Sequence, residues 1–320
     1  MSKFKDISTV TFYTIILFIF LDMVIFRHCF HFGLAITDTY GSDKSIHKYQ
    51  PYFEFMDANK LQNESSYDNA NFYKDDGSLR VAFFGGSTGV PLDEKYFSES
   101  LTKHLGKKVQ VVNFSCSSAE HKQHLHMLVE LLPKYNPDII IFYGGVNETT
   151  LHYSMDPRPG FPYNYYYKHD TSPLLQFLIE NSAVISTLEM KYGLFTTQKK
   201  LAKEYNVGSD EYNKKIVDKY FETLMLAKNV SSTLKSKEFG KTKFLAFYQP
   251  FQIPKYFEET NSQIKKEIKN VDYIFDIQNA YNDLDKDIWI DYCHVKDDSG
   301  ANKHIIDVMS EITAKQAQKL

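Results

Sequence analysis

The stretch VAFFGGSTG, residues 81–89, decides the fold of this chain. Its first four residues, Val81 to Phe84, have the length and composition of a short buried strand, and the glycine pair that follows marks a sharp turn. Similar apolar runs recur along the chain, at residues 109–113, 138–143, 243–248 and 271–277. Together these runs predict a sheet of five strands that is buried on both faces.

Segments with the apolar spacing of helices lie between or after these runs, at residues 95–105, 120–132, 212–234 and 299–315. Strands that alternate with helices form βαβ units, in which the crossovers are right-handed and the strands run parallel. We therefore predict an α/β fold of three layers, with a mostly parallel five-stranded sheet between two layers of helices. Ligands of such sheets bind beyond the carboxyl ends of the strands.

One segment, from Thr149 to about Gly208, interrupts this alternation, and we interpret it as an insertion near the site. Its first part, HYSMDPRPGFPYNYYYKHD, holds three prolines and a cluster of aromatic residues. The tyrosines have two explanations, because they either stack on the sugar rings of a polysaccharide or pack the insertion against the domain. These residues are Tyr153, Tyr163, Tyr165, Tyr166 and Tyr167.

The N-terminal stretch ISTVTFYTIILFIFLDMVIF, residues 7–26, has about the length that a helix needs to cross a bilayer. We expect the span to tolerate its one charge, Asp22, because that residue lies near one end, where water is close. A cleaved signal peptide and a buried core helix are the alternatives. The apolar run is long for a signal peptide, and Arg27, His28 and His31 follow it where small residues would stand.

The span divides the chain into an anchor, a polar stalk and an α/β domain, at residues 1–30, 31–78 and 79–320. Lys3 and Lys5 precede the span, whereas Arg27 follows it. This balance favours a cytoplasmic N-terminus, because basic residues gather on the cytoplasmic side. The globular domain is then predicted to lie outside the membrane, in the periplasm or the extracellular space.

Three polar motifs follow directly after successive predicted strands: GGSTG at 85–89, NFSCSS at 113–118 and GGVNE at 144–148. Because the carboxyl ends of parallel strands meet at one edge of the sheet, we expect these motifs to converge. Far downstream, the segment DIWIDYCH ends with Asp291 and His294, just before the last predicted helix.

Ser87, His294 and Asp291 form a complete set of side chains for acyl transfer. A serine hydroxyl is a weak nucleophile that needs a base within hydrogen-bond reach, and the pKa of histidine lies near the working pH. A carboxylate then orients the imidazole and stabilises its charged form. The glycines around Ser87 allow backbone N–H groups to approach a substrate oxygen, and Asn147 is a candidate side-chain donor to the same oxyanion.

The order and spacing of these motifs resemble the SGNH hydrolases, also called GDSL-type esterases, over about three quarters of the chain. The resemblance implies a flavodoxin-like sheet, with Ser87 as the nucleophile and Asp291 and His294 as its supporting pair. It also implies an oxyanion hole formed by Ser87, Ser118 and Asn147. An ester substrate is implied as well, with an O-acetylated carbohydrate of the cell envelope as one class. Whether the acyl group passes to water or to another acceptor stays open.

The chain departs from the family pattern at three positions. Ser118 stands where the family has the oxyanion glycine, so its backbone N–H can serve as a donor only if its φ is negative or a positive φ is tolerated. Gly86 and Glu148 stand where aspartates are common. Because of Ser118, a catalytically silent membrane-anchored scaffold that binds glycan or protein is the alternative function. The GGSTG motif taken alone also fits a tight turn or the nucleophile elbow of α/β-hydrolases.

Other polar residues of the motifs have simpler explanations. His121, His124 and His126 suggest a metal site, but no carboxylate or cysteine pattern accompanies them, so we interpret the segment as a helix that exposes polar histidines. Asn113 and Asn147 each begin an N-x-[ST] sequon, yet their places at buried strand ends disfavour glycosylation. We therefore assign both asparagines to the site and predict no metal or cofactor.

Composition excludes one further class of protein. The net charge is −3 and the basic residues are scattered, so there is no electrostatic footprint of a nucleic-acid-binding protein. The three cysteines are too few and too far apart for a disulfide framework, and they form no C-x-x-C pair.

Overall fold

The chain divides into two compact units in its computed structural model. The N-terminal unit combines residues 1–45 with 165–204, and the sheet unit combines residues 46–164 with 205–320. Part of the predicted insertion therefore belongs to the same unit as the N-terminal helix. The structure describes residues 2–29, 47–50, 54–57, 73–74, 76–117, 119–154, 157–160, 172–192, 202–284 and 286–318.

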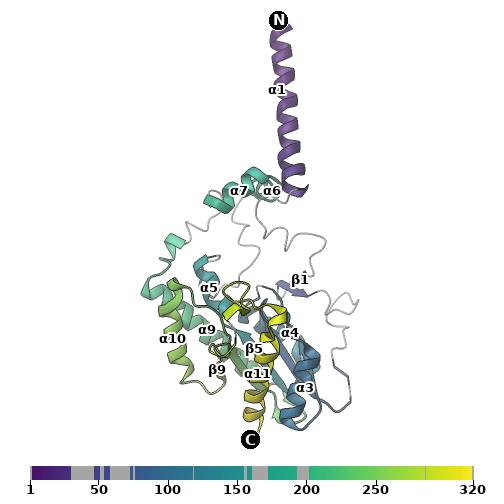
Figure 1. The fold of residues 1–320 in the computed structure, drawn as a ribbon, viewed down its shortest axis with the longest axis vertical. Helices are drawn as coiled ribbons and strands as arrows, with labels where there is room; N and C mark the ends of the chain where they lie inside the picture. Colours follow the sequence, from purple (N-terminus) through teal and green to yellow (C-terminus); the bar gives the residue numbers. More distant parts are fainter. Residues whose placement is uncertain are drawn as a thin grey trace. The chain divides into compact units, whose positions relative to one another are not determined.

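The sheet unit is built on five parallel strands in the order β4-β3-β5-β8-β9 (Figure 1). This is the flavodoxin-like order 2-1-3-4-5, in which the direction of winding reverses beside the first strand. The predicted α/β fold is confirmed. The predicted strands are confirmed too, with ends that differ by at most three residues; the observed strands are β3 (Leu79–Gly85), β4 (Val109–Asn113), β5 (Ile139–Gly144), β8 (Lys243–Tyr248) and β9 (Ile274–Asp276).

Helices cover both faces of this sheet. On one face α3 packs against α11, and on the other α4 packs against α9, which also contacts α10 (Figure 1). Four of these helices were predicted; the bounds are α3 (Glu94–Leu105), α4 (His121–Tyr135), α9 (Asp210–Ser231), α10 (Glu258–Ile268) and α11 (Ala301–Ala317).

The alternation of side chains along β3 explains why both layers are needed. Val81 and Phe83 join the apolar cluster under α3 and α11, whereas Ala82 and Phe84 join the cluster under α4 and α9. All four side chains are fully buried. Because consecutive side chains of a strand point to opposite faces, an apolar run of this kind requires cover on both sides.

Shorter elements complete the sheet unit. Within the range predicted as a stalk, the structure has an antiparallel pair, β1 (His47–Gln50) and β2 (Glu54–Asp57). Other elements within the described residues are α5 (Val146–Ser154), β6 (Lys235–Ser236), β7 (Gly240–Lys241) and the short 3-10 turns η4 (Lys255–Phe257), η5 (Lys286–Ile288) and η6 (Asp297–Ser299).

The part of the N-terminal unit that the structure describes includes a long apolar helix and two short helices of the insertion. The long helix, α1 (Ser2–Phe20), continues as the π-helical segment η1 (Leu21–Cys29). The stretch Thr9–Arg27 is long and apolar enough to cross a membrane, and only 6% of it is buried. The insertion supplies α6 (Pro173–Asn181) and α7 (Ala183–Tyr192), which both contact η1.

Candidate active site

The three polar motifs converge as predicted, because β3, β4 and β5 are neighbours and run parallel. The chain leaves β3 at Gly85, β4 at Asn113 and β5 at Gly144, so each motif begins at the same edge of the sheet. Backbone hydrogen bonds join the first two motifs directly, since the N–H of Cys116 donates to the carbonyl of Gly85 at 3.0 Å. This edge is where ligands bind in flavodoxin-like sheets.

Ser87, His294 and Asp291 lie in one hydrogen-bonded line. The Oγ of Ser87 is 2.7 Å from Nε2 of His294, and the Nδ1 of His294 is 2.7 Å from Oδ2 of Asp291. With the carboxylate facing Nδ1, the neutral imidazole carries its proton there, and Nε2 accepts the hydrogen bond of the serine hydroxyl. The arrangement can remove the hydroxyl proton of Ser87 during attack on a carbonyl carbon.

The turn before α11 holds Asp291 and His294 in this geometry. Trp289 and Val295 form an antiparallel bridge across it, and the N–H of Ile290 donates to the carbonyl of His294 at 2.8 Å. The Oδ1 of Asp291 accepts the backbone N–H groups of Cys293 and His294, both at 2.8 Å. Partial burial raises the pKa of Asp291, but these hydrogen bonds and the His294 ring outweigh it and bring the net pKa below its usual value.

The turn that carries Ser87 is supported by Asn113. The side-chain amide of Asn113 donates to the carbonyl of Gly89 at 2.8 Å, and its oxygen accepts the N–H of Ser115 at 2.9 Å. A Cβ atom on Gly89 would lie 2.5 Å from the Oγ of Ser115, so only glycine fits there. Asn113 is buried, and its hydrogen bonds hold the Ser87 turn against the end of β4.

Asn147 lies directly beside the Ser87 turn, at the start of α5. Its amide Nδ2 donates to the carbonyl of Ala119 at 2.9 Å. A Cβ atom on Gly86 would lie 2.4 Å from the same Nδ2, which shows how closely the amide approaches the residue before Ser87. The amide carries a second hydrogen besides the one that the Ala119 carbonyl accepts. Ser118 falls outside the described residues, so its predicted role as an oxyanion donor stays a prediction.

The interpretation of the histidines as an exposed face is wrong for His121 and His124. Both are fully buried on α4, and their ring centroids are 5.9 Å apart. Burial lowers the pKa of each imidazole to about 3. Both rings pack on Phe142 of the central strand β5, so they act as aromatic core residues of this layer. His126 is half-buried.

Glu148 joins two of the motifs, a role that its position after Asn147 did not predict. Its carboxylate is buried and accepts the backbone N–H of His121 at 2.8 Å and that of Gly145 at 2.6 Å. The Nδ1 of His121 lies 3.1 Å from the same carboxylate, without hydrogen-bond geometry. Burial raises the pKa of Glu148.

Tyr153 is the one tyrosine of the predicted aromatic cluster that lies within the described residues. Its hydroxyl donates to Asn213 at 2.6 Å and lies 2.7 Å from the hydroxyl of Thr260, and its ring packs edge-to-face on Tyr212. Tyr153 therefore packs α5 against α9 and α10. Tyr163, Tyr165, Tyr166 and Tyr167 lie outside the described residues.

Among the described residues, one group of side chains could hold a metal ion, and it includes both Asp291 and His294. The ligand atoms of Asp291, Cys293 and His294 lie within 4.8 Å of one another. Burial raises the pKa of the Cys293 thiol, which favours the protonated form over the thiolate that metals bind. The Nδ1 of His294 already faces Asp291, so the donor set fits a proton relay better than a metal centre.

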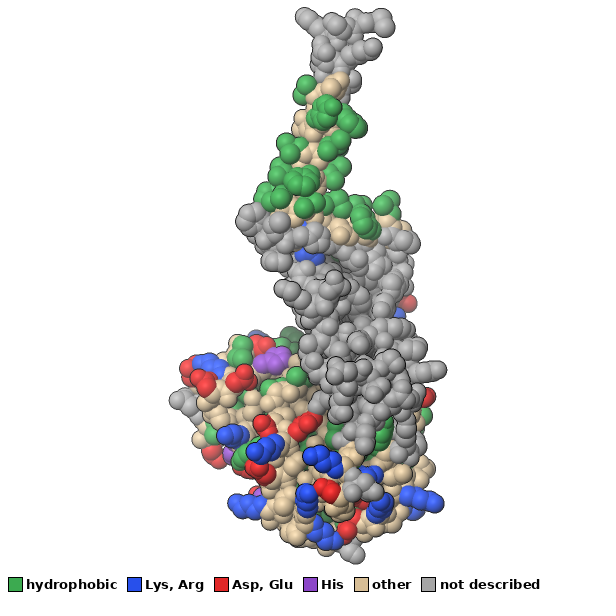
Figure 2. Space-filling model, turned by 90° about the vertical axis from the view of Figure 1, so that its right-hand side faces the viewer, with side chains coloured by type: hydrophobic (Ala, Val, Ile, Leu, Met, Phe, Trp, Pro, Cys, Tyr) green, Lys and Arg blue, Asp and Glu red, His purple; other side chains and the backbone are tan. Residues whose placement is uncertain are grey.

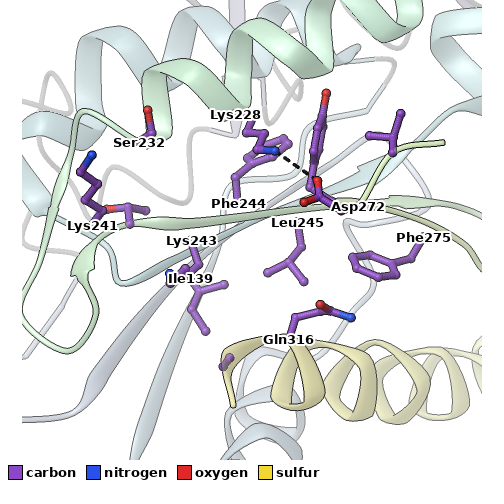
Figure 3. A pocket seen from close by; sticks show the side chains of 14 residues that line it. Ile139, Lys228, Ser232, Lys241, Lys243, Phe244, Leu245, Asp272, Phe275 and Gln316 are labelled. Carbon is purple, nitrogen blue, oxygen red and sulfur yellow. Dashed lines mark hydrogen bonds and ion pairs between the residues drawn. The ribbon is translucent and has the colours of Figure 1, made fainter. Parts of the chain in front are cut away.

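A separate surface pocket lies at the opposite edge of the sheet. It is lined by residues at the starts of β5, β8 and β9 and at the ends of α9 and α11, as Figure 3 shows for Lys228, Lys243 and Gln316. The amine of Lys228 is held by Asp272 at 3.1 Å and by the ring of Tyr273 at 4.2 Å. This pocket lies at the amino ends of the strands and shares no residue with the candidate site.

No protein-family model and no curated protein matches this chain. Solved structures do match. They include a lipase from a goat rumen metagenome, with 14% identity, 73% of this chain and 97% of the lipase covered, and a TM-score of 0.42.

Two further matches come from Bacteroides species. A putative acylhydrolase from Bacteroides fragilis has 13% identity, with 79% of this chain and 97% of that chain covered and a TM-score of 0.40. A GDSL-like lipase from Bacteroides thetaiotaomicron has 12% identity, with 81% of this chain and 98% of the lipase covered and a TM-score of 0.40.

Proposed function

We propose that this protein is a serine-dependent ester hydrolase or acyltransferase that works through a seryl acyl-enzyme. The observation that carries the proposal is the continuous line from Ser87 through His294 to Asp291, with both hydrogen bonds at 2.7 Å. The three residues come from two turns that are more than 200 positions apart in the sequence, and both turns are fixed by backbone hydrogen bonds.

In the first half-reaction the Oγ of Ser87 attacks the carbonyl carbon of the ester, and Nε2 of His294 takes the hydroxyl proton. The C–O bond to the alcohol then breaks, and His294 returns the proton to the leaving oxygen. In the second half-reaction an acceptor hydroxyl gives its proton to His294 and attacks the acyl carbon. The bond from that carbon to the Oγ of Ser87 then breaks, and His294 returns the proton to Oγ. Asp291 holds the Nδ1–H and stabilises the imidazolium in both steps.

The negative charge that develops on the carbonyl oxygen needs donors that are already in place. We assign the second amide hydrogen of Asn147 and the backbone N–H of Ser87 to this role, together with the backbone N–H of Ser118 from the family resemblance. The bond to Ala119 at 2.9 Å fixes the Asn147 amide before substrate arrives. A fixed donor loses little reorganisation energy in the transition state.

The pair that supports Ser87 is accessible to a large substrate. The side chain of Asp291 is 46% exposed and that of His294 is 36% exposed. Such an open site suits an acyl group carried on a bulky molecule, and we propose an O-acyl group, such as an O-acetyl ester of a cell-envelope carbohydrate. The acceptor, water or a second hydroxyl, decides whether the outcome is hydrolysis or transfer.

We further propose that Thr9–Arg27 is a retained membrane anchor, with the N-terminus in the cytoplasm and the sheet unit outside the membrane, beyond a stalk. The apolar side chains of this helix are exposed over most of its length, including Val10 at 66% and Phe18 at 59%. A helix of 19 residues spans at most about 28 Å, close to the thickness of a bilayer's hydrocarbon core.

Covalent labelling with a fluorophosphonate probe and intact-mass readout tests the proposed chemistry without knowledge of the substrate. The full-length protein should gain one adduct, and Ser87→Ala should gain none. Ser232→Ala, at the opposite edge of the sheet, is the control and should label like the wild type. Labelling that persists in Ser87→Ala would refute the assignment of the nucleophile, and a wild-type chain that never labels would favour the silent scaffold.

A further inference from the structure

The two short helices of the insertion expose large apolar side chains within the N-terminal unit. On α6, Leu174 is 69% exposed and Phe177 is 53% exposed, and on α7, Val184 is 47% exposed. Soluble proteins seldom leave a run of apolar surface like this uncovered. Figure 2 shows hydrophobic side chains along α1 and again over the short helices at its end. The insertion therefore continues the apolar surface of the proposed anchor.

Asp22 joins the anchor to this pair of helices. Its side chain is only 6% exposed, although it belongs to an otherwise apolar segment. One carboxylate oxygen accepts the backbone N–H of Val184 at 2.8 Å, and the other accepts the hydroxyl of Ser182. Ser182 in turn caps α7, since its Oγ accepts the N–H of Ile185 at 3.1 Å. The carboxylate thus occupies the N-terminus of α7, where the helix dipole favours a negative charge.

This junction fixes the depth of the short helices along the anchor. Asp22 precedes Arg27, the last residue of the apolar stretch, by five residues. This is at most about 7 to 8 Å along the axis, because the π-helical segment η1 rises less per residue than an α-helix. Helices that lie in the membrane interface bury their apolar face about 5 to 10 Å below the headgroups. The two depths agree. Tyr192, at the end of α7, is 46% exposed, and tyrosine is enriched at this level of a membrane.

We propose that α6 and α7 form an interfacial helix pair that lies in the lipid bilayer beside the anchor, with Leu174, Phe177 and Val184 among the acyl chains. The partner of this surface is the phospholipid bilayer itself. Asp22 is a structural link in this arrangement, because it accepts a backbone N–H in the first turn of α7 at a depth where water is scarce. The inference rests on the proposed anchor and is independent of the proposed esterase activity.

Quenching of a single tryptophan in vesicles tests the proposal on the full-length chain. The background variant Trp289→Phe removes the only native tryptophan. Phe177→Trp then reports on α6, Phe12→Trp reports on the anchor, and Met225→Trp is the control, because Met225 is 47% exposed on α9 in the sheet unit. Each protein is reconstituted in phosphatidylcholine vesicles with or without brominated acyl chains, and acrylamide serves as the aqueous quencher.

We expect tryptophan at 177 to lose most of its emission in brominated lipid and to be shielded from acrylamide, like tryptophan at 12. Tryptophan at 225 should show the reverse. If position 12 is quenched by brominated lipid and position 177 only by acrylamide, the interfacial pair is refuted while the anchor stands. If tryptophan at 12 is not quenched by brominated lipid either, both the anchor and the interfacial pair are refuted. Labelling by the fluorophosphonate probe still reports separately on the esterase site.

Two further variants guard against damage to the fold by a single substitution. Leu174→Trp should repeat the result of Phe177→Trp, because both side chains belong to the same exposed face. Asp22→Ala in the Phe177→Trp background should reduce quenching by brominated lipid at 177, since α7 loses its carboxylate partner. The same change should leave quenching at 12 in place. Unchanged quenching at 177 in Asp22→Ala would refute the role of Asp22 as the link.

Discussion

The carboxylate of Glu148 accepts the backbone N–H of His121 at 2.8 Å, and so joins the start of α5 to the start of α4. Its second oxygen accepts the N–H of Gly145 at 2.6 Å. Glu148 follows Asn147 directly, and His121 follows the loop whose Ala119 carbonyl holds the Asn147 amide. One buried carboxylate therefore fixes both the residue proposed to donate to the oxyanion and the loop that orients it.

Replacing Glu148 by alanine should destabilise the sheet unit by about 2 to 6 kcal/mol, because two buried N–H groups lose their acceptor and each costs about 1 to 3 kcal/mol. Labelling by the fluorophosphonate probe should also slow, since the Asn147 amide loses its support. Urea unfolding of the full chain in detergent, followed by Trp289 emission, measures the first effect. Glu130→Ala, an exposed position on α4, is the control. Equal stability of the two variants would contradict the prediction.

The buried histidines should make the sheet unit sensitive to acid. The unfolded chain binds a proton at His121 and at His124 below about pH 6.5, whereas the folded chain does so only near pH 3. The unfolded state thus binds more protons in this window, so stability is lost as pH falls. Glu148 changes the stability in the opposite direction. Its raised pKa makes the folded chain hold a proton that the unfolded chain releases, so this group adds stability as pH falls.

His124→Phe isolates one of these titrations, since phenylalanine suits a site between Phe84 and Phe142. Between pH 7 and pH 5 the variant should lose about 2 kcal/mol less stability than the wild type, as one uncompensated histidine contributes about that much over this range. Urea midpoints at the two pH values measure the difference. His104→Gln, on the half-exposed His104, should follow the wild type. If His124→Phe lost as much stability as the wild type between pH 7 and pH 5, His124 would not be buried in its neutral form.

The sequence predicted the sheet because its signals are local. Each strand is an apolar run ended by glycine or a polar residue, and Val81 to Phe84 needed cover on both faces whatever the tertiary arrangement. The convergence of the motifs that carry Ser87 and Asn147 was predictable for a similar reason, since parallel strands bring their carboxyl ends together. The pairing of Ser87 with His294 was predicted from the order of the motifs and from the chemistry of a serine and its base. The spacing of Asp291 and His294 then limited the pair to one turn.

Features that depend on distant partners were not predictable. Asp22 was expected to lie close to water. It is instead buried, and it accepts hydrogen bonds from Ser182 and Val184, which lie about 160 residues away. The spacing of His121 and His124 showed that they share a helical face, but not that this face turns toward Phe142. In both cases a polar residue was assigned to solvent, and tertiary packing placed it inside.

The proposed anchor predicts how the protein fractionates. Full-length protein should stay in the membrane pellet after an alkaline carbonate wash, because removal of residues 9–27 from lipid exposes a long apolar helix to water. A shorter chain that begins near Asp57 should be released by the same wash, since interfacial helices alone hold a protein reversibly. Full-length chain found in the soluble fraction with its N-terminus intact would contradict the anchor.

The closeness of Gly86 to Asn147 gives the sharpest test of the oxyanion assignment. Asn147→Ala should slow acylation by about 10²- to 10³-fold, the usual effect of losing one donor. Gly86→Ala should slow it as well, because the new Cβ would lie 2.4 Å from the Asn147 amide and 3.3 Å from the Ala119 carbonyl. The amide would then have to leave its position.

The double variant separates this explanation from damage to the Ser87 turn. In the Asn147→Ala background the amide that collides with residue 86 is gone, so Gly86→Ala should have little further effect on the rate of fluorophosphonate labelling. The two losses would then be strongly non-additive, as expected for residues in contact. Urea midpoints measured alongside show whether either change unfolds the unit. Losses that simply multiply would mean that Gly86→Ala displaces the nucleophile itself, and Asn147 would then have to be tested as a donor by other means.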